Sequence, residues 1–294
     1  MGAVLTKYRG EYVLKIAISV FLAAALCSFL VAGADSSTHN RLTAKERADG
    51  WKLLFDGKSM TNWIDPAAAN PPGDAWSIED GCLKAKPNPR ITEDLVSTEK
   101  YRDFELQWDW KVSSNGNSGV KYRIQKFVVL TEATKKESGA KKFEDLVNYG
   151  ISHSAEGDRT KIGNSGKAQI YVIGFEYQMI DDAGDTDAKN GGLYKTGAFY
   201  GIQGPLRPAA RPVGEFNHSR LVVRGKHVEH WLNGVKVVDS TFDGDQFRDA
   251  VAKRWGKDSA AYHLMVDQPS EQCPFSLQNH DHATWFRDIK IKRL

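Results

Sequence analysis

The feature that most constrains the fold is a run of three short strands joined by two tight turns. In "LVVRGKHVEHWLNGVKVVD", residues 221–239, apolar and polar side chains alternate on either side of Gly225-Lys226 and Asn233-Gly234. Asn-Gly between two such segments is a strong signal for a β-hairpin, because the turn needs positive φ at both positions. Successive hairpins need antiparallel neighbours, so the segment predicts an antiparallel sheet rather than a parallel sheet with crossover helices.

The same two-residue period recurs elsewhere in the chain. In "DFELQWDWKV" the apolar side chains from Phe104 to Trp110 all fall on one face. "WSIEDGCLKA" is predicted to be a hairpin that turns at Asp80-Gly81, and "TWFRDIKIKRL" a final strand. Many antiparallel strands with few short helices predict an all-β jelly-roll sandwich of two antiparallel sheets.

Two short helices are expected outside the strands. Asp245 is a candidate cap for "QFRDAVAKRW", and a second helix is expected between Lys141 and Val147. The second helix lies in segment 126–168, which is rich in Lys, Glu, Ser and Gly and interrupts two predicted strands. We interpret 126–168 as an insertion at the rim of the concave face that shapes ligand choice, because loops on a rigid sheet commonly set specificity.

The first 34 residues are typical of a secretory signal peptide. Lys7, Arg9 and Lys15 precede an apolar run over 16–30, and Ala32-Gly33-Ala34 supplies a small-x-small cleavage site. The apolar run is short for a membrane span, with an uncleaved anchor as the alternative. We therefore expect an exported protein, periplasmic or extracellular, with no membrane attachment after cleavage.

The predicted mature chain has a linker over 35–49 and one β-sandwich domain over 50–294. Its formal net charge is +1, because the signal peptide takes three basic residues and one acidic residue from the total of +3. This balance gives no reason to expect a nucleic-acid partner. Cys82 and Cys273 could pair in an oxidising compartment or remain free buried thiols. The sequence indicates no oligomeric state.

Three stretches place polar groups on strand faces. They are Lys121 and Arg123 after Asn117 in "NSGVKYRI", Glu176 and Gln178 in "GFEYQMIDD", and Gln278, His280 and His282 in "SLQNHDHATWFRDI" if that strand continues. Planar Arg, Gln and carboxylate groups, with aromatic platforms, are what a sugar-binding site needs. The three stretches together therefore favour a carbohydrate site.

Each set also has a simpler interpretation. Lys121 and Arg123 could simply lie on a solvent-exposed strand face, and Glu176 and Gln178 could likewise be exposed to solvent without a ligand. His280 and His282 could ligate a metal, but a third ligand is not evident. No cofactor is therefore predicted, and a divalent metal stays an open alternative.

Several long motifs occur in the order of one known family. They are "WKLLFDGKSMTNW", "WSIEDGCL", "STEKYRDFELQWDWKVSSNGNSGVKYRI", "FEYQMIDD", "GEFNHSRLVVRGKHVEHWLNGVKVV" and "FSLQNHDHATWFRDIKI". Together they resemble the 3-keto-disaccharide hydrolase domain family over most of 50–294. The resemblance implies a concanavalin A-like lectin/glucanase sandwich and activity on 3-keto-glycosides. The chain departs from the family in its longer insertion and in "LQNHDH", where "LQ-D-H-G" is more usual.

The implied fold suggests how the acidic strand is used. Retaining glucanases of this fold carry E-x-D-x-x-E on a bulged strand, and the bulge brings the last acid onto the face of the first. Glu176-x-Gln178-x-x-Asp181 has the same spacing, so all three are expected on the concave side, near Arg123 of the adjoining strand. An amide cannot relay a proton, which favours other chemistry on this scaffold.

The implied substrate suggests that chemistry. A ketone at C3 acidifies the C2 hydrogen, so a base can form an enolate, the C1 substituent can leave by elimination, and water can add back. Arg123 is the expected enolate stabiliser, and Glu176, Asp181 and His280 are the unranked base and acid candidates. The expected substrate-binding residues are Asn117, Lys121, Gln178, Tyr194 and Gln278.

Two other functions stay open at this point. A retaining glycosidase would use Glu176 as nucleophile and Asp181 as acid/base. A non-catalytic carbohydrate-binding module would use the same polar strand face for binding alone.

Overall fold

The computed structural model describes residues 38–66, 74–154, 156–157, 162–163 and 166–294. The predicted signal peptide and its cleavage site lie outside these residues. Within the described part of the chain, no helix is long and apolar enough to cross a membrane. The predicted linker contains a short helix, α2 (Ala44–Ala48), which Thr43 and Glu46 cap reciprocally.

The larger sheet holds the predicted hairpins. Its order is β12 (Val235–Thr241), β11 (His227–Leu232), β10 (Asn217–Arg224), β7 (Phe104–Val112), β14 (Thr284–Arg293), β4 (Cys82–Ala85) and β3 (Trp76–Glu79), with β1 (Lys52–Leu53) also paired to β14. All of these pairs are antiparallel. The turn residues Asn233 and Gly234 both have positive φ, as their hairpin requires.

The smaller sheet is dominated by two long strands. Its order is β2 (Trp63–Ile64), β6 (Leu95–Ser97), β13 (Ser276–Leu277), β8 (Asn117–Thr131), β9 (Ala168–Ile180) and β5 (Ile91–Glu93). The pairs of this sheet are antiparallel, as predicted, except that β5 pairs with β9 in parallel and makes the sheet mixed at this edge. The two strands are far apart in the chain, and no hairpin dictates their relative direction.

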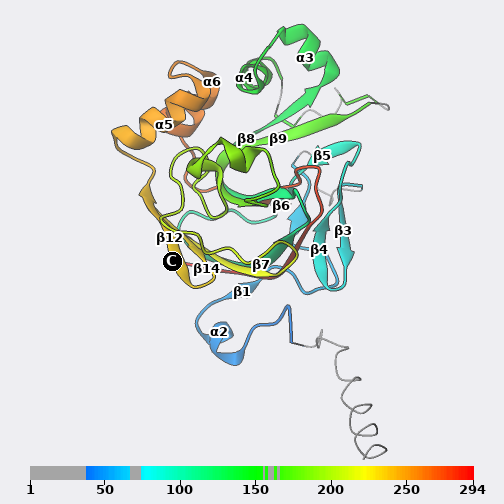
Figure 1. Ribbon diagram of the computed structural model, residues 1–294, viewed down its shortest axis with the longest axis vertical. Helices are drawn as coiled ribbons and strands as arrows, with labels where there is room; N and C mark the ends of the chain where they lie inside the picture. Colours follow the sequence, from blue (N-terminus) through cyan, green and yellow to red (C-terminus); the bar gives the residue numbers. More distant parts are fainter. Residues whose placement is uncertain (1–37, 67–73, 155, 158–161, 164–165) are drawn as a thin grey trace, which may run out of the picture. The chain divides into compact units, whose positions relative to one another are not determined.

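The two sheets pack face to face, which confirms the predicted sandwich (Figure 1). The apolar face of β7, including Trp108 and Trp110, is buried between them, while the alternate residues are half-buried. A buried polar link also joins the sheets. The Tyr122 hydroxyl donates to His230 Nε2 at 2.9 Å, and His230 Nδ1 donates to the Gly197 carbonyl at 3.0 Å. Burial lowers the pKa of His230 to about 3, which keeps this ring neutral.

Four helices gather at one end of the β8–β9 pair, whereas α2 lies on the other side of the sandwich, beside β1 (Figure 1). The four are α3 (Glu132–Ser138), α4 (Phe143–His153), α5 (Asp245–Trp255) and α6 (Ala260–Tyr262). Three short one-turn elements are η2 (Asp187–Asn190), η3 (Gly192–Tyr194) and η4 (His263–Asp267). α4 begins two residues after the expected start and runs to His153. The expected cap Asp245 is itself the first helical residue of α5, and Gly244 occupies the cap position.

The insertion is shorter than its predicted bounds of 126–168. β8 continues to Thr131 and β9 begins at Ala168, so the helical part occupies the stretch between them. The sequence hides this extension because a bulge between Tyr122 and Lys126 breaks the alternation of β8. The two buried thiols, Cys82 and Cys273, are free.

Candidate active site

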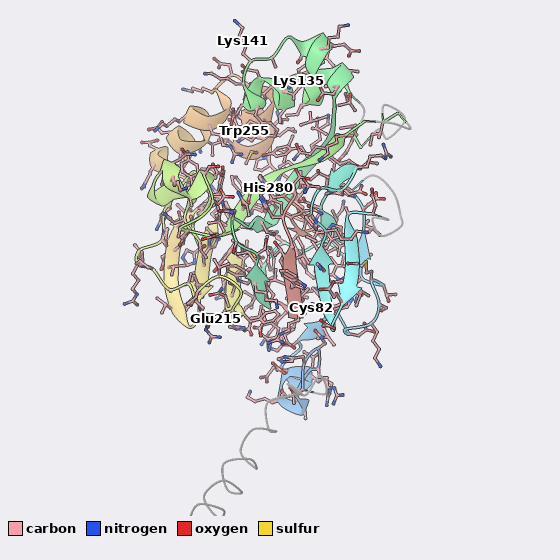
Figure 2. All side chains as sticks on the ribbon, turned by 45° about the vertical axis from the view of Figure 1, so that its right-hand side comes forward. Cys82, Lys135, Lys141, Glu215, Trp255 and His280 are labelled. Atoms are coloured by element: carbon pink, nitrogen blue, oxygen red, sulfur yellow. The ribbon has the colours of Figure 1, made fainter. Side chains whose placement is uncertain are left out.

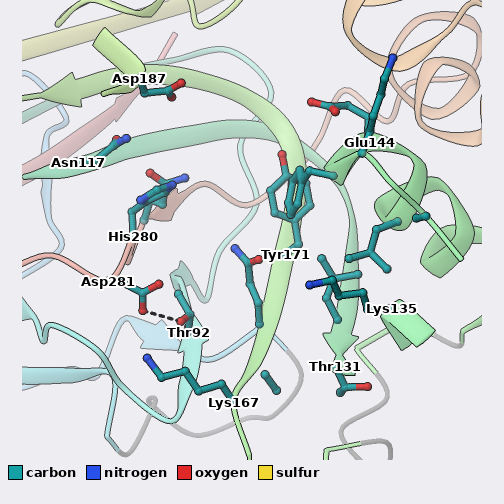
Figure 3. Close-up of a pocket in the computed structure, with 18 of the residues that line it drawn as sticks. Thr92, Asn117, Thr131, Lys135, Glu144, Lys167, Tyr171, Asp187, His280 and Asp281 are labelled. Atoms are coloured by element: carbon teal, nitrogen blue, oxygen red, sulfur yellow. Dashed lines mark hydrogen bonds between the residues drawn. The ribbon is translucent and has the colours of Figure 1, made fainter. Parts of the chain in front are cut away.

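A pocket of about 660 Å³ lies on the outward side of the β8–β9 pair (Figure 3). Its wall combines strand residues, the α3–α4 insertion, the last turn of α5 and the loop after β13. The side chains of Phe175, Tyr177 and Met179 point into the core, so Glu176 and Gln178 point outward, as the two-residue period predicts. The overlying helices and loops bury this polar face instead of leaving it in water.

Glu176 occupies the centre of the polar face. It pairs across the strands with Lys121, and its side chain lies over Gly119, the third residue of β8. A Cβ atom at Gly119 would stand 2.4 Å from the Glu176 carboxylate oxygen, so only glycine leaves room for this arrangement. The "NSG" triplet of "NSGVKYRI" therefore helps to set the position of the acid.

The charges around Glu176 are buried together. Lys121 Nζ lies 3.9 Å from Asp94 Oδ2 and 4.6 Å from the centre of the Tyr171 ring. Burial raises the pKa of Glu176 to about 7, although the positive charges of Lys121 and Arg254 oppose the shift. Burial also disfavours the charged form of Lys121, but its negative neighbours, led by Asp94, outweigh that effect and raise its pKa. Glu176 is therefore a carboxyl group that can hold or release a proton near neutral pH.

Arg254 forms one wall of the pocket beside Glu176. Its guanidinium lies 4.8 Å from the centre of the Tyr200 ring and donates to the Tyr171 hydroxyl at 3.3 Å. The Tyr200 hydroxyl donates in turn to Asp187 at 2.8 Å. These aromatic contacts hold a permanent positive charge at the pocket surface.

Four amide side chains line the pocket, and three of them are buried: Asn117, Gln178 and Gln278. Gln178 Nε2 and Gln278 Oε1 have no hydrogen-bond partner among the described residues. A buried donor and a buried acceptor without partners are costly unless a ligand satisfies them. The pair is therefore suited to a ligand hydroxyl group, which can both accept and donate.

His280 also lines the pocket, although its strand ends earlier than expected. β13 stops at Leu277, and the Thr92 hydroxyl holds the following loop by donating to Asp281 at 2.8 Å (Figure 3). The enclosing wall and the nearby charge of Lys121 lower the pKa of His280. His282 stacks on His280 with ring centres 6.3 Å apart but does not line the pocket.

Arg123 does not join this site, contrary to the prediction. It lies in the β8 bulge with φ at +50°, which turns its side chain away from the face that Lys121 occupies. Its Nη2 donates to the Gly225 carbonyl at 2.5 Å, and its guanidinium packs 4.1 Å from the centre of the Phe242 ring. The expected pairing of Arg123 with Glu176 is therefore wrong, because simple alternation fails at a bulge.

Asp181 is also separate from the pocket. β9 ends at Ile180 without a bulge there, and the Asp181 carboxylate accepts hydrogen bonds from the backbone N–H groups of Asn115, Ala183 and Gly184 at 2.9–3.1 Å. Burial tends to raise its pKa, but these donors outweigh it and leave the pKa below the usual value. The prediction that Asp181 shares the face of Glu176 is wrong, since the acid fixes a turn.

Tyr194 lies one layer outside the pocket. Its ring contacts the Tyr200 ring edge-on, with centres 5.1 Å apart, while Tyr200 itself lines the wall. The expected aromatic platform is therefore formed by Tyr200 and Tyr171 instead. Tyr200 and Arg254 were missed because they come from segments that share no period with the predicted polar faces. Tyr171 lies on β9 itself but out of phase with Glu176, so the two-residue period assigns it to the other face.

The described pocket residues include no cluster of three His, Cys, Asp or Glu ligand atoms close enough to share a cation. Within the described residues, two clusters could hold a cation: His39, Asp109 and Asp288, and His227, Glu229 and Asp239. Neither cluster includes a residue that lines the pocket. The described lining of the pocket combines carboxyl, amide, imidazole, ammonium and guanidinium groups with aromatic rings.

Comparisons with known proteins find one family model that matches most of the chain and several similar proteins. The family model described as "3-keto-alpha-glucoside-1,2-lyase-like domain" matches residues 50–292. The chain is 28% identical over 260 residues to a 3-keto-disaccharide hydrolase of Bacteroides thetaiotaomicron, covering 84% of this chain and 79% of that protein. A candidate glycosyl hydrolase of Parabacteroides distasonis is similar in structure, with 26% identity, a TM-score of 0.63, and coverage of 87% of this chain and 99% of the other. A second such structure from that organism, with 24% identity, a TM-score of 0.52 and coverage of 83% and 99%, shares the fold.

The burial of Glu176 should make the stability of the folded protein depend on pH. Its pKa rises from 4.5 to about 7 on folding, so the folded state favours the protonated form. Below pH 4.5 Glu176 is protonated in both the folded and the unfolded protein, so its shifted pKa costs no stability. Between pH 4.5 and 7 the unfolded state releases the proton first, which costs the fold up to about 3 kcal/mol. Glu176→Gln, which is always neutral, should therefore be more stable than the natural protein above pH 7.

Denaturant unfolding at pH 4.5 and pH 8 measures this difference. Glu79→Gln, on the exposed end of β3, is the matched control and should show no such gain. Equal stability of Glu176→Gln and the natural protein at pH 8 would contradict the burial of a charge at this position.

Proposed function

Because this chain belongs to the family of 3-keto-alpha-glucoside-1,2-lyase-like domains, we propose that it cleaves the glycosidic bond of 3-keto-glycosides. Its relatives support a carbohydrate-active hydrolase as the general class. The observation that carries the specific proposal is the pairing of Glu176, whose pKa is about 7, with the fixed charge of Arg254 in one pocket. Such a pair can remove a carbon-bound proton and hold the resulting negative charge.

The first half of the proposed reaction is an elimination. The Glu176 carboxylate takes the C2 proton, and the C2–H electron pair moves to the C3 oxygen as an enolate that Arg254 stabilises. The enolate then re-forms the ketone, the C1–O bond breaks, and the departing oxygen takes a proton from the His280 imidazolium. A lowered His280 pKa makes this imidazolium a stronger acid, although fewer molecules carry it at neutral pH.

The second half is the addition of water to the unsaturated sugar. Neutral His280 takes a proton from water as the oxygen attacks C1, and protonated Glu176 returns its proton to C2. Both residues are then in their starting states, and one water has been consumed. A Glu176 pKa near neutrality suits this alternation, because the same group must accept a proton and give it back.

The acid pair predicted for a retaining glycosidase is not brought together in this pocket. A retaining mechanism needs a second carboxyl group about 5 Å from the nucleophile. Asp181, the predicted partner, instead accepts three backbone hydrogen bonds outside the pocket. The amide groups of Gln178 and Gln278 each have an unpartnered polar atom. They can bind sugar hydroxyl groups, and they remain neutral throughout the reaction.

The substrate class is tested with matched sugars. Purified protein is incubated with a 3-keto-glucoside and with its unoxidised parent, each with and without a chelator. Only the keto sugar should be cleaved, because the parent has no acidified C2 hydrogen. Equal cleavage of the parent would exclude the elimination route, and loss of activity with chelator would add a metal to the site.

Two arginines provide a matched pair of variants. Arg254→Met should lower kcat by about a hundredfold or more, with a smaller change in KM, because the enolate charge is largest in the transition state. Arg123→Met should change kcat only slightly, since its guanidinium packs on Phe242 away from the pocket. Thermal unfolding of both variants controls for folding. A large loss of kcat in Arg123→Met with little change in Arg254→Met would instead identify Arg123 as the group that stabilises the enolate.

Export is part of the proposal and rests on the N-terminal pattern of basic residues, apolar run and Ala32-Gly33-Ala34. The mature protein should begin near Asp35. N-terminal sequencing of protein recovered outside the cytoplasm checks this, and an intact Met1 would contradict it.

A further inference from the structure

The α3–α4 insertion forms the far wall of the pocket, beyond the proposed catalytic residues. Four lysines line this wall: Lys135, Lys141, Lys142 and Lys167. All four are exposed, and Lys135 and Lys141 lie on the outer segment that carries α3 (Figure 2). Figure 3 shows Lys135 beside the helices of the insertion and Lys167 near Thr92 and Asp281, both away from Asn117 and Asp187.

The positive charge on this wall is largely uncompensated. Among the described residues, no carboxylate forms an ion pair with the ammonium group of any of these lysines. The insertion contributes only Glu132 and Glu144 to the pocket lining. The negative charge of Glu144 helps to raise the pKa of Arg254, so Glu144 acts on a residue of the proposed catalytic site. An anion at the lysine wall would therefore meet net positive charge.

An apolar surface lies beside the lysines. Phe143 lines the pocket and leaves 39% of its surface exposed. An exposed phenylalanine ring does not stabilise the fold as a buried one would. Its ring meets the Tyr171 ring edge-on, with centres 5.0 Å apart, and Leu130 and Leu146 also line this part of the pocket. Exposed aromatic surface within a pocket is typical of ligand contact.

From these two features we propose that the insertion is a leaving-group subsite for a flat aromatic aglycone that carries an anionic substituent. The ring would pack against Phe143, and the anion would lie at the lysines. Lys135, Lys141 and Phe143 all come from the segment between β8 and β9, so the sugar half and the aglycone half of the pocket are built by different parts of the chain. This inference rests on the proposed function for its turnover test but not for its binding test.

The turnover test compares phenyl and 4-carboxyphenyl 3-keto-glucosides. The natural protein should prefer the 4-carboxyphenyl compound in kcat/KM, and added salt should reduce the preference. Lys135→Glu with Lys142→Glu should lower that preference by about tenfold. The control, Lys136→Glu with Lys253→Glu, makes the same change of net charge at exposed residues outside the pocket and should keep it. Phe143→Ala should slow both aryl compounds relative to methyl 3-keto-glucoside.

The binding test uses 4-hydroxybenzoate and phenol, the two free leaving groups, in calorimetric titrations. Tighter binding of 4-hydroxybenzoate that is lost in the pocket double variant, but kept in the control, supports the subsite even if no 3-keto-glycoside is cleaved. Equal binding and equal kcat/KM for the charged and neutral compounds would overturn the subsite. If cleavage of methyl 3-keto-glucoside persists in that case, the proposed function stands without it.

Discussion

The site depends on burying a carboxylate, an ammonium group and a guanidinium together on the outward face of the β8–β9 pair. Charged groups are costly to bury unless they are paired, and here Lys121 balances both Asp94 and Glu176. The helices that cover this face create the pocket and at the same time raise the pKa of Glu176. Reactivity near neutral pH and a loss of stability therefore have the same physical cause.

The sandwich provides the rigid support that this arrangement requires. β8 and β9 contribute apolar side chains to the core and polar side chains to the pocket in strict alternation around Glu176. The buried contacts of Tyr122 and Tyr177 with the opposite sheet fix the inner face of both strands. The insertion joins the far ends of the same two strands, so a change in its sequence can alter the pocket wall without altering the strand that carries the acid.

Most of the fold could be predicted from the sequence, because hairpin turns and the two-residue period are local signals. Those signals placed Glu176 and Gln178 correctly on the outward face. They failed where geometry departs from the period, since the β8 bulge redirects Arg123 and Asp181 begins a turn. Arg254 could not be found in this way, because only the tertiary packing of α5 brings it to Glu176. The same holds for the parallel pairing of β5 with β9, which no turn residue encodes.

The central claim is that Glu176 removes the C2 proton of a 3-keto-glycoside. Single-turnover rates on substrate carrying hydrogen or deuterium at C2, followed with the natural protein and with Glu176→Gln, test it most directly. If Glu176 is the base, the deuterated substrate is cleaved more slowly and the variant does not cleave it. Deuterium is lost from the product to the extent that the Glu176 carboxyl exchanges with ordinary water before the second half of the reaction. Equal rates with deuterium retained at C2, together with a glycosyl ester trapped on Glu176, would contradict the claim.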